Sequence, residues 1–157
     1  MGDEDSFNVE PFSQWWERNG HRFVGVDPLV LEQWVHRHFH LTPFKLPLNG
    51  LVSRREAWTT DDILKRVHTS DRLSAGHDYQ ALGANWGQDM LALGTWRCPI
   101  LVLETPNGLR QRAGDWPLAR YALIEGHRRF RMLNALACRN EAAFEHDVLL
   151  IAYEDGR

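Results

Sequence analysis

A short basic segment holds the residues whose types and spacing best fit a chemical task. A short apolar run is followed by a glycine, a histidine and three arginines, in the order Gly126, His127, Arg128, Arg129 and Arg131. The first turn of a helix offers unpaired N–H groups and a partial positive charge, so anions bind there. Arginine side chains also match the geometry of phosphate. The segment therefore predicts a strand, a glycine turn and a helix whose start binds phosphate, since a bound anion would explain cations at that position.

His127 and Glu125 are the candidates for catalysis at this site. Because the unperturbed pKa of histidine is about 6.5, His127 is suited to acid–base work, although a hydrogen bond to a phosphate oxygen is the favoured interpretation. Glu125 directly precedes the glycine and has the oxygens that Mg²⁺ takes beside phosphates. The alternative for Glu125 is a cap or an ion pair with an arginine, and Glu104 is a second candidate carboxylate. The arginines have a simpler alternative, which is a solvated helix face.

The elements that must position this segment alternate between strand and helix patterns. Continuous apolar runs predict buried strands at 100–103, 122–124 and 148–153. One helix is predicted over 86–93, with Gly94 as its C-terminal cap, and another follows the glycine turn. Strands and helices in this order predict an α+β core with layered packing.

The N-terminal half is predicted to be mainly helical. Helices are expected over 12–19 and 28–40, the second with Asp27 as its N-cap, and a short strand is expected over 21–26. We therefore divide the chain into a helical N-terminal extension, residues 1–75, and a core.

Two spacings of the capping-box type predict further helices in that extension, one at Ser53 and Glu56 and one at Thr59 and Asp62. Residues 70–85 are rich in Ser, Gly, Asp and Asn and are expected to form a loop, as is the segment 105–116. The core then covers residues 76–157, and we expect the extension to pack onto it as one compact unit.

The core resembles a known fold. The helix Trp86-Gly87-Gln88-Asp89-Met90-Leu91-Ala92-Leu93-Gly94, followed by Cys98-Pro99-Ile100-Leu101-Val102-Leu103, resembles the helix and "PIxV" strand of the ParB/sulfiredoxin fold. The box GHRRFRML at 126–133 resembles the phosphate-binding box of that fold. The box is approximately G-E-R-R-x-R-A in ParB proteins, G-C-H-R in sulfiredoxins and G-H-H-R in the related free-serine kinases. Gly126 takes the common glycine, and Arg129 takes the common arginine.

The resemblance covers roughly residues 84–155 and implies a site for a nucleoside triphosphate. ATP or CTP is the expected ligand, with Mg²⁺ as its companion, and Gly126, Arg128 and Arg129 are the implied phosphate contacts. Sulfiredoxin activity is not expected, because His127 stands where that family has its cysteine and neither Cys98 nor Cys138 takes its place. The helix-turn-helix region that follows this domain in ParB proteins is not found within the 157 residues.

Composition excludes several classes of function. A net charge of −3 disfavours a protein that holds nucleic acid by bulk electrostatics. The N-terminus is acidic and shows no signal-peptide pattern, and no apolar run approaches the roughly 20 residues of a membrane span, so we expect a cytoplasmic protein without a membrane partner. The two cysteines form no disulfide framework or zinc motif.

Some remaining residues have a functional and a structural interpretation. His36 and His40 share a helix face, as two metal ligands would, but no third ligand lies nearby, so surface or core-edge histidines are favoured. Arg54 and Arg55 are interpreted as solvated surface. The tryptophans, of which the chain has seven, are expected in the core, unless several are exposed together and form a partner surface.

Two functions of different classes follow from these features. The first is a nucleotide- or phosphate-binding ParB-like protein, with the options of a Mg²⁺-dependent NTPase, a phosphotransferase or a nuclease. The alternative is a non-catalytic protein-binding regulator of the immunity or anti-defence type on the same fold. A DNA-associated regulator is disfavoured by the net charge.

Overall fold

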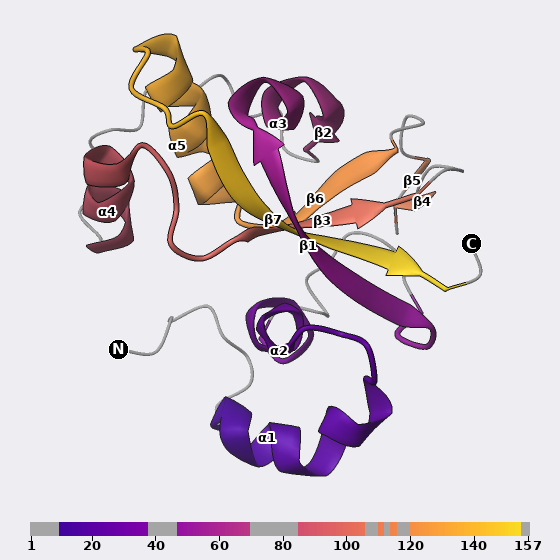
Figure 1. Ribbon diagram of the computed structural model, residues 1–157. Coiled ribbons are helices and arrows are strands. Elements are labelled where there is room, and N and C mark those ends of the chain that lie inside the picture. The colour runs from indigo at the N-terminus through magenta and orange to yellow at the C-terminus, as the bar shows by residue number, and fades with distance from the viewer. Residues whose placement is uncertain are drawn as a thin grey trace.

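The computed structural model describes residues 10–37, 47–69, 85–105, 110–111, 114–115 and 120–154, and its centre is a five-stranded mixed sheet (Figure 1). The order across the sheet is β1-β7-β3-β6-β2. These strands are β1 (Leu51–Thr59), β2 (Val67–His68), β3 (Ile100–Glu104), β6 (Tyr121–Glu125) and β7 (Glu145–Tyr153). The protein is thus an α+β protein, as the alternation of patterns predicted.

The strands run in both directions. β7 is antiparallel to β1 and parallel to β3, and β6 is antiparallel to β3 and parallel to β2. Two very short strands, β4 (Arg110–Gln111) and β5 (Gly114–Asp115), pair with each other outside this sheet. Antiparallel pairing of β3 with β6 brings the start of β3 beside the end of β6.

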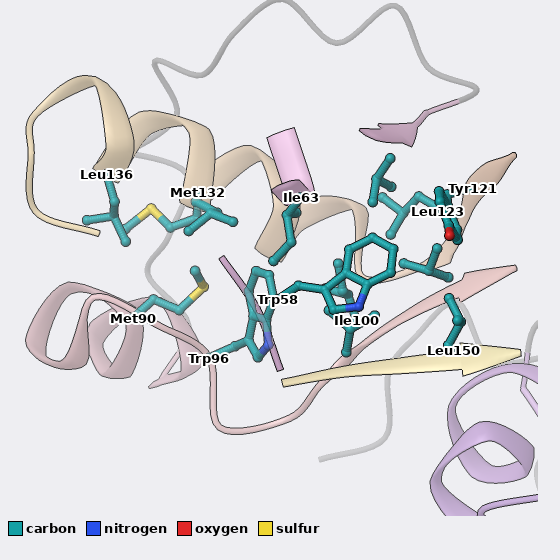
Figure 2. Close-up of a cluster of buried hydrophobic side chains, with 14 residues drawn as sticks. Trp58, Ile63, Met90, Trp96, Ile100, Tyr121, Leu123, Met132, Leu136 and Leu150 are labelled. Atoms are coloured by element: carbon teal, nitrogen blue, oxygen red, sulfur yellow. The ribbon is translucent and has the colours of Figure 1, made fainter. Parts of the chain in front are cut away.

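Three helices cover one face of the sheet. They are α3 (Thr60–Arg66), α4 (Asn85–Leu93) and α5 (His127–Cys138). Trp58 lies in the middle of the buried cluster beneath them, with Ile63 of α3 and Ile100 of β3 close to it (Figure 2). Met132 and Leu136 of α5 complete this face, which is the larger of the two cores.

The N-terminal segment covers the opposite face. It consists of α1 (Phe12–Asn19), the 3-10 helix η1 (Gly20–Arg22), α2 (Pro28–Val30) and the π-helical turn η2 (Leu31–Val35). In Figure 1 these elements lie below the sheet, whereas α3 and α5 lie above it. Leu31 and Trp34 of η2 pack against the face of the sheet that the three helices do not cover, and this face includes Leu101 and Leu149. The sheet is therefore the middle layer of the molecule.

Helices with local start and stop signals occur as predicted. α1 begins and ends at the residues expected, and Asp27 caps α2 by accepting a hydrogen bond from the Leu29 N–H at 2.9 Å. Thr59 caps α3 through the Asp62 N–H, and Gly94 ends α4 with a φ of 68°. No helix within the described ranges is long and apolar enough to cross a membrane.

Two predictions for the N-terminal half are wrong. The helix predicted from Ser53 and Glu56 does not form, because residues 51–59 pair along their whole length with β7 and this long-range pairing overrides the local spacing. The strand predicted over 21–26 is instead a 3-10 turn followed by a loop. The sheet accordingly takes strands from both sides of residue 75, so residues 1–75 do not form a purely helical unit.

Some predictions concern residues that the structure does not describe. The C-terminal end of the helix expected over 28–40, with His38 and His40, lies outside the described residues, as do most of the loop 70–85 and part of the segment 105–116.

Candidate functional site

Gly126 forms the turn between β6 and α5, as the sequence predicted. Its φ of 97° and ψ of 26° lie in the left-handed region, which residues with a Cβ rarely adopt. A Cβ built at this position would lie 2.8 Å from Cγ2 of Ile100, so the packing leaves no room for one. Gly126 is the N-cap of α5, and this helix start has neither a side-chain cap nor an acidic residue in its first turn.

Glu125 lies at the same turn, and its carboxylate is already bound to the backbone. Its Oε1 accepts a hydrogen bond from the Gly126 N–H at 3.0 Å. The contact fits the capping alternative for Glu125, and it also shows that this backbone amide attracts an anion. No group of three or more metal-ligating side chains occurs among the described residues, so a metal held here would take most of its ligands from a phosphate or from water.

Arg129 points inward and binds the protein itself. Its Nη1 donates to the carbonyl oxygens of Cys98 at 2.7 Å and Pro99 at 3.1 Å. Its Nη2 donates to Oε1 of Gln33 in η2 at 3.0 Å. The guanidinium therefore joins α5, the start of β3 and the N-terminal layer, a role that the sequence motif did not predict.

The other cations of the segment stand on the outer side of α5. Arg128 is exposed, whereas His127 and Arg131 are half-buried. Arg128 and Arg131 are three residues apart and so share one face of the helix. The structure thus brings Glu125, His127, Arg128 and Arg131 to one helix start and turns Arg129 away into the fold.

Glu104 does not belong to this site. It ends β3 and pairs in register with Tyr121 at the start of β6, whereas Glu125 lies at the other end of β6. Glu104 accepts hydrogen bonds from Arg54 at 2.9 Å and from Arg120 at 2.9 Å. The hydrogen bond from Arg54 is the largest cause that lowers the pKa of Glu104 below its ordinary value, and partial burial opposes it.

A polar and aromatic cluster surrounds Glu104 that sequence reasoning missed. Arg54 also binds Glu56, which in turn accepts a hydrogen bond from Nε1 of Trp58 at 2.7 Å. Arg66 lies over the rings of Trp58 and Tyr121, at 4.5 Å and 4.8 Å from their centres. The signal was present in the sequence: Arg54, Glu56 and Trp58 recur at a spacing of two, which is typical of one face of a strand.

The charges of this cluster satisfy one another. Arg54 bridges the carboxylates of Glu56 and Glu104, Arg120 pairs with Glu104, and Arg66 pairs with Asp62 at 3.5 Å. These contacts join β1, β3, β6 and α3, and they explain the cluster as a structural feature.

The buried histidines do not assemble a metal site. His36 lies between the rings of Phe12 and Trp15, and neither of its ring nitrogens has a hydrogen-bond partner among the described residues. His146 is buried as well, with Thr60 Oγ1 at 2.7 Å from Nε2 and Thr95 Oγ1 at 2.8 Å from Nδ1. Both side chains lie in packed regions away from α5's first turn.

The remaining candidates are structural. Trp34 and Trp58 are buried, and Trp15 and Trp16 pack against the core beneath the N-terminal layer. Arg55 lies between two acidic partners, each at 3.8 Å: Asp27 and Asp147.

Comparison with known proteins adds no assignment: the chain matches no family model, no curated protein and no solved structure. What the geometry defines is an α+β protein with a glycine turn, a helix start and three basic side chains at the C-terminal end of β6.

Proposed function

We propose that the protein has a ParB/sulfiredoxin-like fold and binds the phosphates of a nucleoside triphosphate, ATP or CTP, at the start of α5. One observation carries this proposal. α5 begins at a left-handed glycine with no side-chain cap and no acid in its first turn, and a histidine and three arginines follow within five residues, two of them on the outer side of the helix. Cations at that position are repelled by the positive end of the helix dipole. A bound phosphate would turn this repulsion into a net attraction, because both the dipole and the cations attract it.

The charges of the helix start favour an anion. Arg128 and Arg131 contribute two positive charges, His127 contributes a ring N–H donor, and the helix dipole adds to them. Glu125 supplies one negative charge beside them. An exposed arginine at a helix start forms charge-assisted hydrogen bonds with phosphate oxygens, which are stronger than neutral ones.

In this proposal each residue has its own part. Arg128 and Arg131 bind the outer phosphates, the first-turn amides of α5 bind a neighbouring phosphate, and His127 donates a hydrogen bond. Glu125, once released from the Gly126 N–H, would hold the accompanying Mg²⁺, which would neutralise charge on the phosphates. Hydrolysis or phosphotransfer at such a site would proceed by positioning and by neutralisation of charge, with a phosphotransferase, an NTPase and a nuclease as the reaction types.

Titration of the whole protein with ATP and with CTP, with and without Mg²⁺, tests the proposal. Arg128→Gln should weaken binding about tenfold, equivalent to about 1.4 kcal/mol, because it removes a charged donor from an exposed phosphate contact. Arg139→Gln is the matched control, since it removes the same charge at the other end of α5 and should leave binding unchanged. Absence of binding by both nucleotides at millimolar concentration would reject the proposal.

A non-catalytic protein-binding role is the second proposal, and one surface favours it. Leu93 is 47% exposed and Phe144 is 77% exposed, and the hydrogen bond from Ala143 N–H to the Gly94 carbonyl at 2.9 Å brings their segments together. Exposed apolar side chains that lie together are common where proteins bind one another. The nucleotide titration separates the two roles, because a pure protein binder leaves both nucleotides unbound.

A further inference from the structure

One side chain of the N-terminal layer reaches the start of α5. Gln33 lies in η2, and its amide oxygen accepts from Nη2 of Arg129 at 3.0 Å, across 96 residues of sequence. The amide nitrogen of the same residue lies 2.9 Å from Sγ of Cys98. Gln33 is therefore held at both ends of its amide and is fixed in one orientation.

Arg129 has only part of its hydrogen-bonding capacity committed to the backbone. Both hydrogens of Nη1 are directed to the carbonyl oxygens of Cys98 and Pro99, at the start of β3. Among the described residues, Nη2 donates to Gln33. The guanidinium is thus anchored at Nη1 by main-chain carbonyls, and its Nη2 is bound to the neutral amide of Gln33.

The Nη2 side of the guanidinium lies against the glycine at which α5 begins. A Cβ built on Gly126 would be 3.1 Å from both Nε and Nη2 of Arg129. The absence of a side chain at Gly126 is what allows the guanidinium this close to the helix start. Release of Nη2 would consequently add a donor at the edge of the phosphate site.

We infer that Gln33 is a gate on Arg129: it holds the Nη2 edge of the guanidinium away from the ligand, and the N-terminal layer thereby restrains the site. This inference rests on the proposed phosphate binding. A phosphate oxygen is a stronger acceptor for a guanidinium than an amide oxygen is, so the ligand competes with Gln33 and the contact lowers affinity without abolishing it. The anchoring of Nη1 to the residues before β3 keeps the planar fork in place, so the ligand replaces the Gln33 oxygen as the acceptor of Nη2.

Two substitutions at one position test the gate with opposite expected signs. Gln33→Met removes the amide oxygen at similar length and should tighten binding of ATP about fivefold, in keeping with the usual net strength of one hydrogen bond. Gln33→Glu keeps the shape but adds a negative charge, which holds Arg129 more firmly, and should weaken binding. Gln14→Glu on the exposed side of α1 adds the same charge to the same layer and should have no effect.

Isothermal titration of the full chain with ATP, and with inorganic phosphate as a minimal ligand, gives the readout. Thermal unfolding of each variant shows that it is folded. The gain from Gln33→Met must disappear in the Arg129→Lys background, because a lysine lacks the second donor edge.

The outcomes separate the gate from the proposed function. If the unsubstituted protein binds and neither Gln33 variant changes the affinity, the gate is wrong and the phosphate site stands. If only Gln33→Met binds, the gate is supported in its strongest form. If no variant binds either ligand, the phosphate site is wrong and the gate is rejected with it.

Discussion

Gly126 meets two separate requirements, and each excludes a different set of residues. Its left-handed backbone excludes almost every residue with a Cβ, and the contacts with Ile100 and Arg129 exclude even the smallest one. A glycine that only opened a turn would tolerate alanine at a moderate cost. Gly126 does not tolerate alanine in this way, because a guanidinium and a side chain of β3 pack directly against it.

Gly126→Ala is therefore expected to lower the free energy of unfolding by about 2 to 4 kcal/mol, from backbone strain and crowding together. Urea unfolding followed by fluorescence measures the change. Gly50→Ala is the control, because Gly50 also has a positive φ but a Cβ there meets nothing within 4 Å. Equal losses for the two variants would show that crowding at Gly126 has no weight.

The direction of each arginine could not be predicted from the motif. The sequence placed Gly126 at a strand–helix junction correctly, because glycine, apolar run and helical pattern are local signals. Whether Arg129 faces solvent or the fold depends on the carbonyl groups of Cys98 and Pro99 and on Gln33, which are distant in sequence. Such long-range acceptors leave no trace in a short motif.

The same division holds for the elements. The apolar runs of β3, β6 and β7 and the caps of α1, α2 and α3 were sufficient to predict these elements. β1 was predicted as a helix because Ser53 and Glu56 have capping-box spacing, while the pairing with β7 that makes it a strand is non-local. Elements whose formation depends on nearby residues could be predicted from the sequence, whereas β1, which depends on pairing with a distant strand, could not.

At one junction between elements, the hydrogen bonds show that Nε2 of His146 carries a hydrogen. Thr60 Oγ1 lies 2.7 Å from the Ala143 carbonyl and 2.7 Å from Nε2 of His146. The hydroxyl has one hydrogen, which it donates to the carbonyl, so it accepts from the imidazole, and Nε2 carries the proton. In the neutral ring, which burial favours, Nδ1 accepts from Thr95, and the ring ties α3, β7 and the segment after α4 together.

Burial is the main cause that lowers the pKa of His146 below its ordinary value. The unfolded chain therefore takes up a proton at a higher pH than the folded protein does. The stabilisation from His146 is present above about pH 6.5 and is lost as the pH falls from there through the lowered pKa of the folded state.

The protonation of His146 should be visible in the pH dependence of the free energy of unfolding. Urea unfolding between pH 8 and pH 5 is expected to give a declining free energy of unfolding for the natural chain and a flatter profile for His146→Gln, which cannot be protonated there. His21→Gln changes an exposed histidine and should keep the natural slope. An unchanged slope in His146→Gln would mean that other groups cause the acid sensitivity.

At the scale of the molecule, the sheet is buried on both faces, and each cover comes from a different part of the chain. The N-terminal layer covers Leu101, Leu103, Leu149 and Ile151, all of them fully buried, while α3, α4 and α5 cover the other side. β1 is an edge strand of the same sheet and comes from the residues first assigned to an extension. The chain therefore folds as one unit around its sheet.

A fragment of residues 76–157 should consequently fail to fold. It lacks β1, β2 and the whole N-terminal layer, so a large apolar face of β3 and β7 would be open to water. Circular dichroism and the dispersion of an amide NMR spectrum measure this, with a chain of residues 10–157 as the folded control. A well-dispersed spectrum of the fragment would contradict the single-unit description.

The place of β7 in the sheet has a consequence for synthesis on the ribosome. β7 is the last strand along the chain, yet it lies between β1 and β3 and pairs with both. While the chain is being made, β1 and β3 have left the ribosome long before the strand that joins them exists. Until residue 153 has emerged, β1 lacks its partner and β3 can pair only with β6, so the edges that β7 will cover are open to other nascent chains during that interval. The charged side chains Arg54, Arg55 and Glu56 in the middle of β1 stand where such mispairing would begin, and they discourage it.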